Sequence, residues 1–276
     1  MTRHVIFRGI VDSTELGPNY SEGFERLIAE SQSHGFSGWD FSWLKDRLIE
    51  EPPPWDYKKE VEKELLNVRT LLDLGTGGGE LISSLGRLPE QTYVTEGYPP
   101  NAIIARDRLK PFGIDVVRTY AEDNTARHQS GALPFRTGSL DLVIDRHEPF
   151  VAREVYRVLK KGGIFLTQQV GSANFPELNE FLGAPKVEGA AWNLRVTREQ
   201  IGEAGLYETD GREASLEARF TDVGAVVFYL LAVPWQLQGF SVSSYLDRLK
   251  ELHRLIARTG SFRVTTRRFC VRSVKR

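Results

Sequence analysis

The sequence predicts an α/β fold built on a mostly parallel sheet. Candidate strands and helices alternate from about residue 68 to residue 170, and the strand segments are short apolar runs. A glycine-rich turn joins the first of these strands to the first helix. Alternation of this kind favours parallel strands joined by right-handed crossovers.

The bulk composition is that of a folded protein of the reducing cytosol. Of its 276 residues 41% are hydrophobic, which supports one large domain or one domain with a substantial extension. No apolar run approaches membrane-spanning length and the start of the chain does not resemble a signal peptide, so we expect a cytoplasmic protein without membrane contact. The single cysteine, Cys270, excludes an internal disulfide framework and a cysteine-rich zinc site, and no metal site is expected. A net charge of −1 gives no overall attraction for nucleic acid.

Residues 1–67 are expected to form an N-terminal helical extension that could serve as a lid. The aromatic stretch "GFSGWDFSW" is followed by prolines 52–54, which end one helix, and a second helix is predicted from about Trp55 to Asn67. Aromatic side chains usually pack in a core, but here they could also cover a ligand. The four candidates for that role are Trp39, Trp43, Trp55 and Tyr57.

Residues 68–276 are expected to form the main domain. Strands are predicted at 68–74, 92–96, 114–119, 140–145 and 163–169, with helices at 79–88, 100–110 and 149–160. Pro149 at a helix start and Gly162 after its end are the usual boundary residues. Further on we expect a helix at 197–204, a strand at 206–214, a helical insertion at about 220–260 and a final strand at 262–274. The basic tail from Arg258 is expected to be the solvated face of an edge strand rather than an RNA-binding patch.

The glycine turn lies within "TLLDLGTGGGELI", residues 70–82. The dinucleotide fingerprint requires glycine at the first, third and sixth positions of such a turn; Gly75 and Gly77 fill the first two, but Glu80 occupies the sixth. An acid there would repel a pyrophosphate, which disfavours a nicotinamide dehydrogenase, and the lysine of a P-loop is missing. A ligand with positive charge and no phosphate suits Asp73 and Glu80 better. S-adenosylmethionine, a sulfonium, has these properties.

Four motifs in order resemble those of the class I S-adenosylmethionine-dependent methyltransferases, in particular the bacterial type 11 group. They are D-x-G-x-G-x-G from Asp73 to Gly79, the acid Glu96 at the end of the second strand, "LPFRTGSLDLV" at 133–143 and "EVYRVLKKGG" at 154–163. The resemblance covers roughly residues 68–170. It implies a Rossmann-like fold with a seven-stranded, mostly parallel sheet and helices on both faces.

The resemblance also implies a binding site for S-adenosylmethionine. Its members would be the turn residues Asp73, Gly75, Thr76, Gly77 and Gly79, the strand-end acid Glu96, and an acid after the third strand, Glu122 or Asp123. The carboxylate of Glu96 would accept both ribose hydroxyls, and the later acid would contact the adenine amino group. The segment around Glu122 is longer than in relatives, so the resemblance does not decide whether Glu122 or Asp123 would contact the adenine. Glu96 and Asp73 have structural alternatives, as a surface acid and as a satisfied turn carboxylate, and Glu80 fits a cofactor contact or a helix N-terminal charge equally.

The segment "DRHEPF", residues 145–150, follows the fourth strand, where ligands bind in open α/β sheets. Methyl transfer is an in-line displacement, and holding the reactants in line supplies much of the rate. His147 is the candidate general base if the acceptor must lose a proton, with Arg146 and Glu148 beside it as further catalytic candidates. Alternatively, His147 or Glu148 caps the next helix, and Arg146 pairs with Asp145 or with an acidic substrate group. Other residues that could line the acceptor site are Gln168, Gln169 and Asn174.

These observations predict a cytoplasmic methyltransferase, monomeric or homodimeric, that acts on a small-molecule acceptor. Two other classes stay open. An RNA or other nucleic-acid methyltransferase would need a basic, aromatic groove and would bind RNA in a salt-sensitive way. A non-catalytic protein would bind S-adenosylmethionine but form no S-adenosylhomocysteine.

Overall fold

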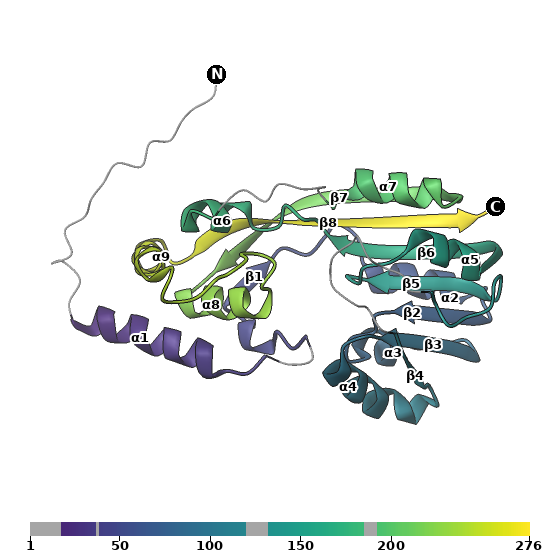
Figure 1. The fold of residues 1–276 in the computed structure, drawn as a ribbon, viewed down its shortest axis with the longest axis horizontal. Coiled ribbons are helices and arrows are strands. Elements are labelled where there is room, and N and C mark those ends of the chain that lie inside the picture. The colour runs from purple at the N-terminus through teal and green to yellow at the C-terminus, as the bar shows by residue number, and fades with distance from the viewer. Residues whose placement is uncertain (1–17, 37–38, 120–131, 185–191) are drawn as a thin grey trace, which may run out of the picture.

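A computed structural model gives the fold and describes residues 18–36, 39–119, 132–184 and 192–276. Its sheet has eight strands in the order β1-β7-β8-β6-β5-β2-β3-β4 (Figure 1). The strands are β1 Leu48–Glu50, β2 Thr70–Leu74, β3 Gln91–Glu96, β4 Val116–Arg118, β5 Leu140–Arg146, β6 Leu159–Val170, β7 Leu206–Phe220 and β8 Phe262–Lys275.

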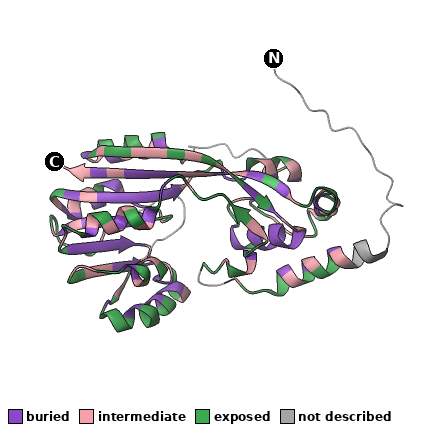
Figure 2. Ribbon diagram, turned by 180° about the vertical axis from the view of Figure 1, so that it is seen from behind, coloured by how far each residue is buried: buried purple, intermediate pink, exposed green. Residues whose placement is uncertain are grey.

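The strands from β6 to β4 form a parallel half-sheet with helices packed around it. These helices are α2 Tyr57–Leu65, α3 Glu80–Ser84, α4 Pro99–Leu109, α5 Ala152–Val158 and α7 Leu194–Glu203, with a 3₁₀ turn at Lys110–Phe112. Side chains in β2 and β5 are almost all buried, as Figure 2 shows in purple, because helices cover the sheet. Helix α2 begins where Asp56 accepts a hydrogen bond from the Lys59 amide, and α7 begins with the same kind of cap from Asn193.

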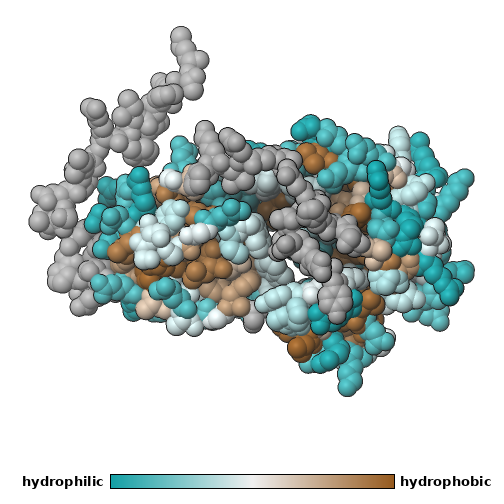
Figure 3. All heavy atoms as spheres, viewed as in Figure 1, coloured by the Kyte–Doolittle hydropathy of each residue, from teal (hydrophilic) through white to brown (hydrophobic). Residues whose placement is uncertain are grey.

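The long antiparallel strands β7 and β8 extend past the parallel strands and form a second lobe, seen at the left of Figure 1. Its helices are α1 Pro18–Ser33, α6 Pro176–Leu182, α8 Val223–Ala232 and α9 Leu246–Thr259, with a 3₁₀ turn at Ser42–Leu44. Helix α8 is buried on nearly all sides and forms the centre of a separate hydrophobic core. Apolar surface on this lobe appears brown in Figure 3. Within the described residues, no helix combines the length and apolar character that a membrane crossing requires.

The predicted α/β class is confirmed, with one difference in strand number. The sheet has eight strands rather than seven, because β1 in the N-terminal region pairs antiparallel with the end of β7. The pairing joins Leu48 to Phe220 and Glu50 to Ala218. The N-terminal region therefore contributes a strand to the sheet in addition to helices.

Two local expectations were wrong. The basic C-terminal strand, β8, lies between β7 and β6 and is not an edge strand. The helix expected at 149–160 begins only at Ala152, because the backbone is extended at Val151, and that N-cap position makes no side-chain hydrogen bond. Neither His147 nor Glu148 therefore caps this helix.

Candidate functional site

The glycine turn follows β2 at the carboxyl edge of the parallel strands. The φ angles of Gly75, Gly77 and Gly79 are +61°, +61° and +81°, values that favour glycine. A side chain at Gly75 would also have no room, because its Cβ would lie 2.5 Å from Cγ of Glu148. The turn is held to the next strand by the Thr76 amide, which donates to the carbonyl of Thr95 at 2.9 Å.

Glu96, at the end of β3, binds directly to this turn. One carboxylate oxygen accepts the Gly77 amide at 2.8 Å, and the other accepts the Tyr98 amide at 2.7 Å. The side chain is buried, and burial raises the pKa of the carboxyl. Each oxygen keeps a lone pair for a further donor. The side-chain amide of the fully buried Asn101 helps to lower the pKa of Glu96, but neither its nitrogen nor its oxygen has a hydrogen-bond partner among the described residues. A buried amide without a partner destabilises the fold, so a ligand that bonded to it would gain binding energy.

Four carboxylates gather at the ends of β2, β3 and β5. Burial raises the pKa of Asp73 to about 7, and the charge of Glu96 adds to this effect. Burial likewise raises the pKa of Glu148 to about 7, with added repulsion from Glu96 and Asp73. Burial and then the charge of Glu148 raise the pKa of Asp145 well above its usual range. A site this rich in acids would repel a phosphate, whereas a ligand carrying positive charge would stabilise the ionised carboxylates. The sulfonium and ammonium of S-adenosylmethionine fit that requirement.

A cleft of about 580 Å³ opens beside the glycine turn. It lies between the segment that precedes α2 and the carboxyl ends of β5 and β6, with one residue from β8. Its lining consists of Glu50, Glu51, Pro52, Pro53, Pro54, Trp55, Asp56, Tyr57, Lys58, Leu81, Arg146, His147, Gln168 and Arg268. The cleft therefore brings the N-terminal region together with Arg146 and His147, which follow the strand predicted at 140–145.

His147 is held in this cleft by Gln168 in a defined tautomer. The Trp55 indole can only donate, and it donates to Oε1 of Gln168 at 2.8 Å. The amide nitrogen of Gln168 therefore faces Nε2 of His147, at 3.2 Å, and must be the donor. It follows that Nε2 accepts, so the neutral ring carries its proton on Nδ1. The left-handed backbone of His147, with φ +70°, is fixed by its amide, which donates to the Gln168 carbonyl at 2.8 Å.

The surroundings keep the His147 ring uncharged. The His147 side chain is exposed at the cleft, yet the bulk of protein around it desolvates the ring and lowers the pKa of the imidazole. The positive charges of Arg146 and Arg268 lower that pKa further. His147 is therefore neutral at pH 7, with the Nε2 lone pair already in a hydrogen bond.

Tyr57 anchors the N-terminal region to the sheet beneath the cleft. Its buried hydroxyl lies 2.8 Å from the carbonyl of Asp145 and 3.1 Å from that of Leu166, and it accepts the Asp145 amide at 3.1 Å. The Asp145 carboxylate is itself fixed by Thr167 and Gln169, which donate to one oxygen at 3.1 and 2.9 Å. The end of β5 is therefore held on both sides.

The other residues predicted for the site have different places. Glu80 is exposed and forms an ion pair with Arg108 of α4, which also donates to the Gly78 carbonyl at 2.7 Å. Gln169 points to Asp145 rather than into the cleft, and Asn174 bonds to Thr266 of β8 at 2.6 Å. Glu122 and Asp123 lie outside the described residues.

The aromatic candidates divide into two pairs. Trp55 and Tyr57 line the cleft. Trp39 and Trp43 belong to the second lobe, where Trp39 packs against Trp235 with ring centroids 5.7 Å apart and Trp43 packs against Phe228 at 4.8 Å.

Sequence reasoning missed two residues. Arg268 reaches the cleft because β8 pairs with β6 and sets Arg268 opposite Val170, a long-range pairing that no local pattern reveals. Asn101 had a weak signal, since it is a polar residue adjacent to the buried helical positions Ala102 and Ala105 of α4.

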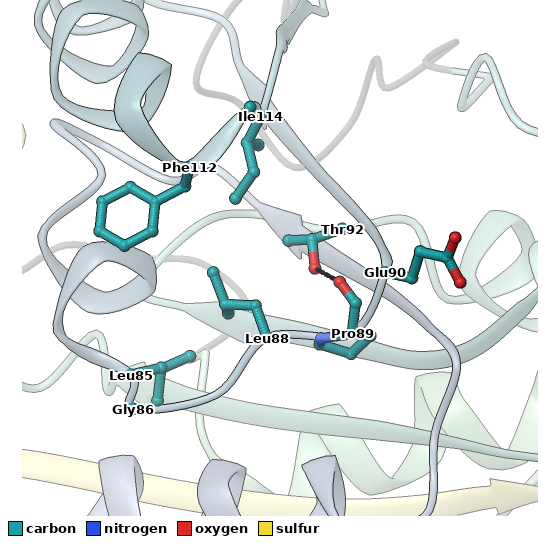
Figure 4. A pocket seen from close by; sticks show the side chains of 9 residues that line it. Leu85, Gly86, Leu88, Pro89, Glu90, Thr92, Phe112 and Ile114 are labelled. Carbon is teal, nitrogen blue, oxygen red and sulfur yellow. Dashed lines mark hydrogen bonds between the residues drawn. The ribbon is translucent and has the colours of Figure 1, made fainter.

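A second hollow, of about 280 Å³, lies at the opposite edge of the sheet (Figure 4). Its lining comes from the loop before β3 and the turn before β4, and it includes Leu88, Phe112 and Ile114. Thr92 there donates to the Pro89 carbonyl at 2.8 Å. No ionisable side chain except Glu90 lines it, so this hollow lacks the groups that a reaction would use.

The parallel half-sheet, its glycine turn and the acid that ends the second parallel strand define a Rossmann-like α/β domain. Residues 72–167 match the family model described as "Methyltransferase domain". This segment of the chain is therefore a methyltransferase domain. Among curated protein sequences, none matches the chain.

Solved structures share this fold at low sequence identity. A Bacillus halodurans protein named as a candidate methyltransferase is 13% identical with a TM-score of 0.52, covering 79% of this chain and 98% of that one. The YcgJ protein of Bacillus subtilis is 16% identical with a TM-score of 0.51, covering 80% and 98%. A Deinococcus radiodurans protein described as functionally unknown is 12% identical with a TM-score of 0.53, covering 92% and 100%. The likeness at these identities is one of fold.

Proposed function

We propose that the protein uses S-adenosylmethionine to methylate a small-molecule acceptor. The observation that carries the proposal is the glycine turn with the buried acids Asp73, Glu96 and Asp145 and the half-buried Glu148 around it, a set that suits a cationic nucleoside and not a phosphate. The match of residues 72–167 to a methyltransferase family supports it.

Three groups of residues would hold the cofactor. Glu96 would accept the ribose hydroxyls with the lone pairs that Gly77 and Tyr98 leave open. The backbone of the glycine turn would allow close approach of the ligand, and the Asn101 amide is available for a further hydrogen bond. Asp73 and Glu148 would face the positive end of the cofactor. When bound, S-adenosylmethionine supplies an activated methyl group on its sulfonium.

We assign Glu148 to this cofactor side rather than to proton transfer with the acceptor. Its side chain lies over Gly75 and does not line the cleft. Displacement or reorientation of Glu148 would accompany cofactor binding, and its charge would complement the ammonium or sulfonium.

The 580 Å³ cleft is the proposed acceptor site. Trp55 and the prolines before it would exclude water from one wall, while Arg146 and His147 contribute the polar groups of the other. His147 would contact the acceptor as a neutral donor through Nδ1, because Gln168 occupies Nε2. Orientation of the acceptor by these groups is what an in-line displacement needs most.

The assignment of the cofactor site and the cleft also suggests how the chain divides into an N-terminal extension and a methyltransferase domain. Residues 1–67 would be the N-terminal extension, which closes the cleft with the segment before α2, and residues 68–276 would be the methyltransferase domain with the helical insertion at about 220–260. We also propose a cytoplasmic location and a monomeric or homodimeric state.

A cofactor panel tests the proposal. S-adenosylmethionine and S-adenosylhomocysteine should each raise the melting temperature in a thermal-shift assay, because a ligand that binds only the native state stabilises it. NAD and ATP should leave it unchanged. Stabilisation by NAD alone would reject the proposed cofactor, and binding of S-adenosylmethionine without product from any acceptor would indicate a non-catalytic protein.

A further inference from the structure

We propose that the methyl acceptor carries a group with anionic oxygens, a carboxylate or phosphate, and that the Arg146 guanidinium binds it in the cleft. This inference rests on the proposed function, because it assigns the cleft to the acceptor. It narrows the acceptor from any small molecule to an acidic one.

The pairing of the charges that line the cleft singles out Arg146. Lys58 lies 3.8 Å from a carboxylate oxygen of Glu62, and Arg268 lies 3.1 Å from one of Glu50. Arg146 is exposed, and no carboxylate among the described residues forms an ion pair with it. Among the Lys and Arg side chains of this lining, Arg146 is therefore the one without an ion pair to a carboxylate of the described residues.

The acids that line the cleft are also engaged. Asp56 caps α2 by accepting the Lys59 amide at 3.1 Å, and Glu51 accepts the Glu217 amide at 3.0 Å. Glu50 is the partner of Arg268. None of these acids forms an ion pair with Arg146, so its guanidinium is open to an anionic group of a ligand.

Arg146 also lies beside a second donor. It is the last residue of β5, adjacent to His147, and opposite Gln168 in the register of β5 and β6. The tautomer fixed by Gln168 leaves Nδ1–H of His147 without a described acceptor. A guanidinium fork next to a neutral N–H donor matches the several lone pairs of a carboxylate or phosphate.

The carboxylate of S-adenosylmethionine itself is another source of the same chemistry. Arg146 acts electrostatically on Asp73 at the glycine turn, so the cofactor lies within its range. The two sources differ in a measurable way. A role toward the acceptor leaves cofactor affinity nearly unchanged in an Arg146 variant, whereas a role toward the cofactor carboxylate weakens S-adenosylhomocysteine binding.

Calorimetry on the full chain saturated with S-adenosylhomocysteine tests the proposal. The probes are benzoate and phenyl phosphate as anions, benzamide as a neutral analogue and benzylamine as a cation. We expect at least one anion to bind at least about tenfold more tightly than benzamide, since hydrogen bonds to charged groups are the stronger ones. Arg146→Gln should remove this preference and Arg146→Lys should keep part of it. Lys63→Gln, which alters an exposed cation of α2 that is paired with Glu60 outside the lining, should keep it in full.

The outcomes separate the acceptor inference from the proposed function. Failure of wild type to bind S-adenosylhomocysteine rejects the cofactor site itself. Normal S-adenosylhomocysteine binding with no anion bound, or with benzamide or benzylamine bound as well as the anions, overturns the acidic acceptor alone. Loss of S-adenosylhomocysteine affinity in Arg146→Gln at unchanged anion binding overturns it in favour of the cofactor carboxylate.

Discussion

Replacing Glu148 with glutamine is expected to remove much of the pH dependence of S-adenosylmethionine binding. Glu148 lies over Gly75, and burial, with repulsion from Glu96 and Asp73, raises its pKa to about 7. A bound cation favours the ionised carboxylate. Affinity for the cofactor should therefore increase as the pH rises from about 5.5 to 8.5, with release of protons on binding near pH 7.

The size of the effect follows from the pKa. The ordinary value is 4.5 and the raised one is about 7. If the cofactor fully restored the ordinary value, the coupling free energy would be about 3.5 kcal/mol, since each pKa unit corresponds to about 1.4 kcal/mol. The affinity for the cofactor can therefore change by at most a few hundredfold between low and high pH. We expect a change of about tenfold or more, because Asp73 and Glu96 also interact with the positive charge of the cofactor.

Isothermal titration at three pH values, in buffers with different ionisation enthalpies, measures both affinity and proton release. Glu148→Gln should bind with a flatter pH profile and release fewer protons. Glu80→Gln is the matched control, because that acid is exposed and paired with Arg108, so its profile should follow wild type. A wild-type affinity that is independent of pH, or an unchanged slope in Glu148→Gln, would refute the charge argument.

Further predictions concern stability, the ribose contact and the two anchoring groups. The pKa of Glu148 is higher in the folded protein than in the unfolded chain, so its ionisation lowers the stability of wild type as the pH rises from about 4.5 through 7. Glu148→Gln should therefore have a larger free energy of unfolding than wild type at pH 8, and not at pH 4.5. Urea titrations at the two pH values measure this difference. Glu96→Ala should weaken S-adenosylmethionine binding at least about tenfold in calorimetry, while circular dichroism stays native; unchanged affinity would make Glu96 a structural acid only. His147→Ala should lower turnover, and the wild-type pH–rate profile should lack an inflection near 6.5; an inflection there that His147→Ala abolishes would instead identify a general base. Tyr57→Phe should cost about 1–3 kcal/mol of unfolding free energy, because the Asp145 amide loses a buried partner, and a cost near zero in urea would contradict the anchoring role.

The sequence predicted the parallel half of the fold well because its signals are local. Apolar runs, the glycine turn and the acid at position 96 each determine a nearby piece of backbone, and β2, β3 and β5 begin and end within about two residues of their predicted positions. The pairing of β1 with β7 joins residues about 170 positions apart, and the central place of β8 depends on its pairing with β6, whose residues are about 100 positions away. Nothing in the basic pattern of β8 distinguishes an edge strand from a central one.

The site shows the same division. The proposed cofactor residues follow from the spacing of the motif, whereas the proposed acceptor cleft is assembled from five separate segments of the chain. The tautomer of His147 depends on Trp55, which donates to Gln168 across the cleft. A sequence shows that a histidine follows a strand but not which of its nitrogens is already bonded, so its role could not be assigned before the structure was known.

The continuous ladder between β7 and β8 affects how the molecule can move. It pairs Leu206 with Lys275 at one end and Phe220 with Phe262 at the other, so the same two strands belong to both lobes. Rotating one lobe against the other would bend or break these backbone hydrogen bonds, unlike motion about a flexible linker. Under the proposed function, any widening of the cleft for an acceptor would come from local displacement of the segment before α2, which Trp55 and Tyr57 hold through a few side-chain hydrogen bonds. The rate of that displacement, rather than a domain rotation, would then limit exchange of acceptor and product.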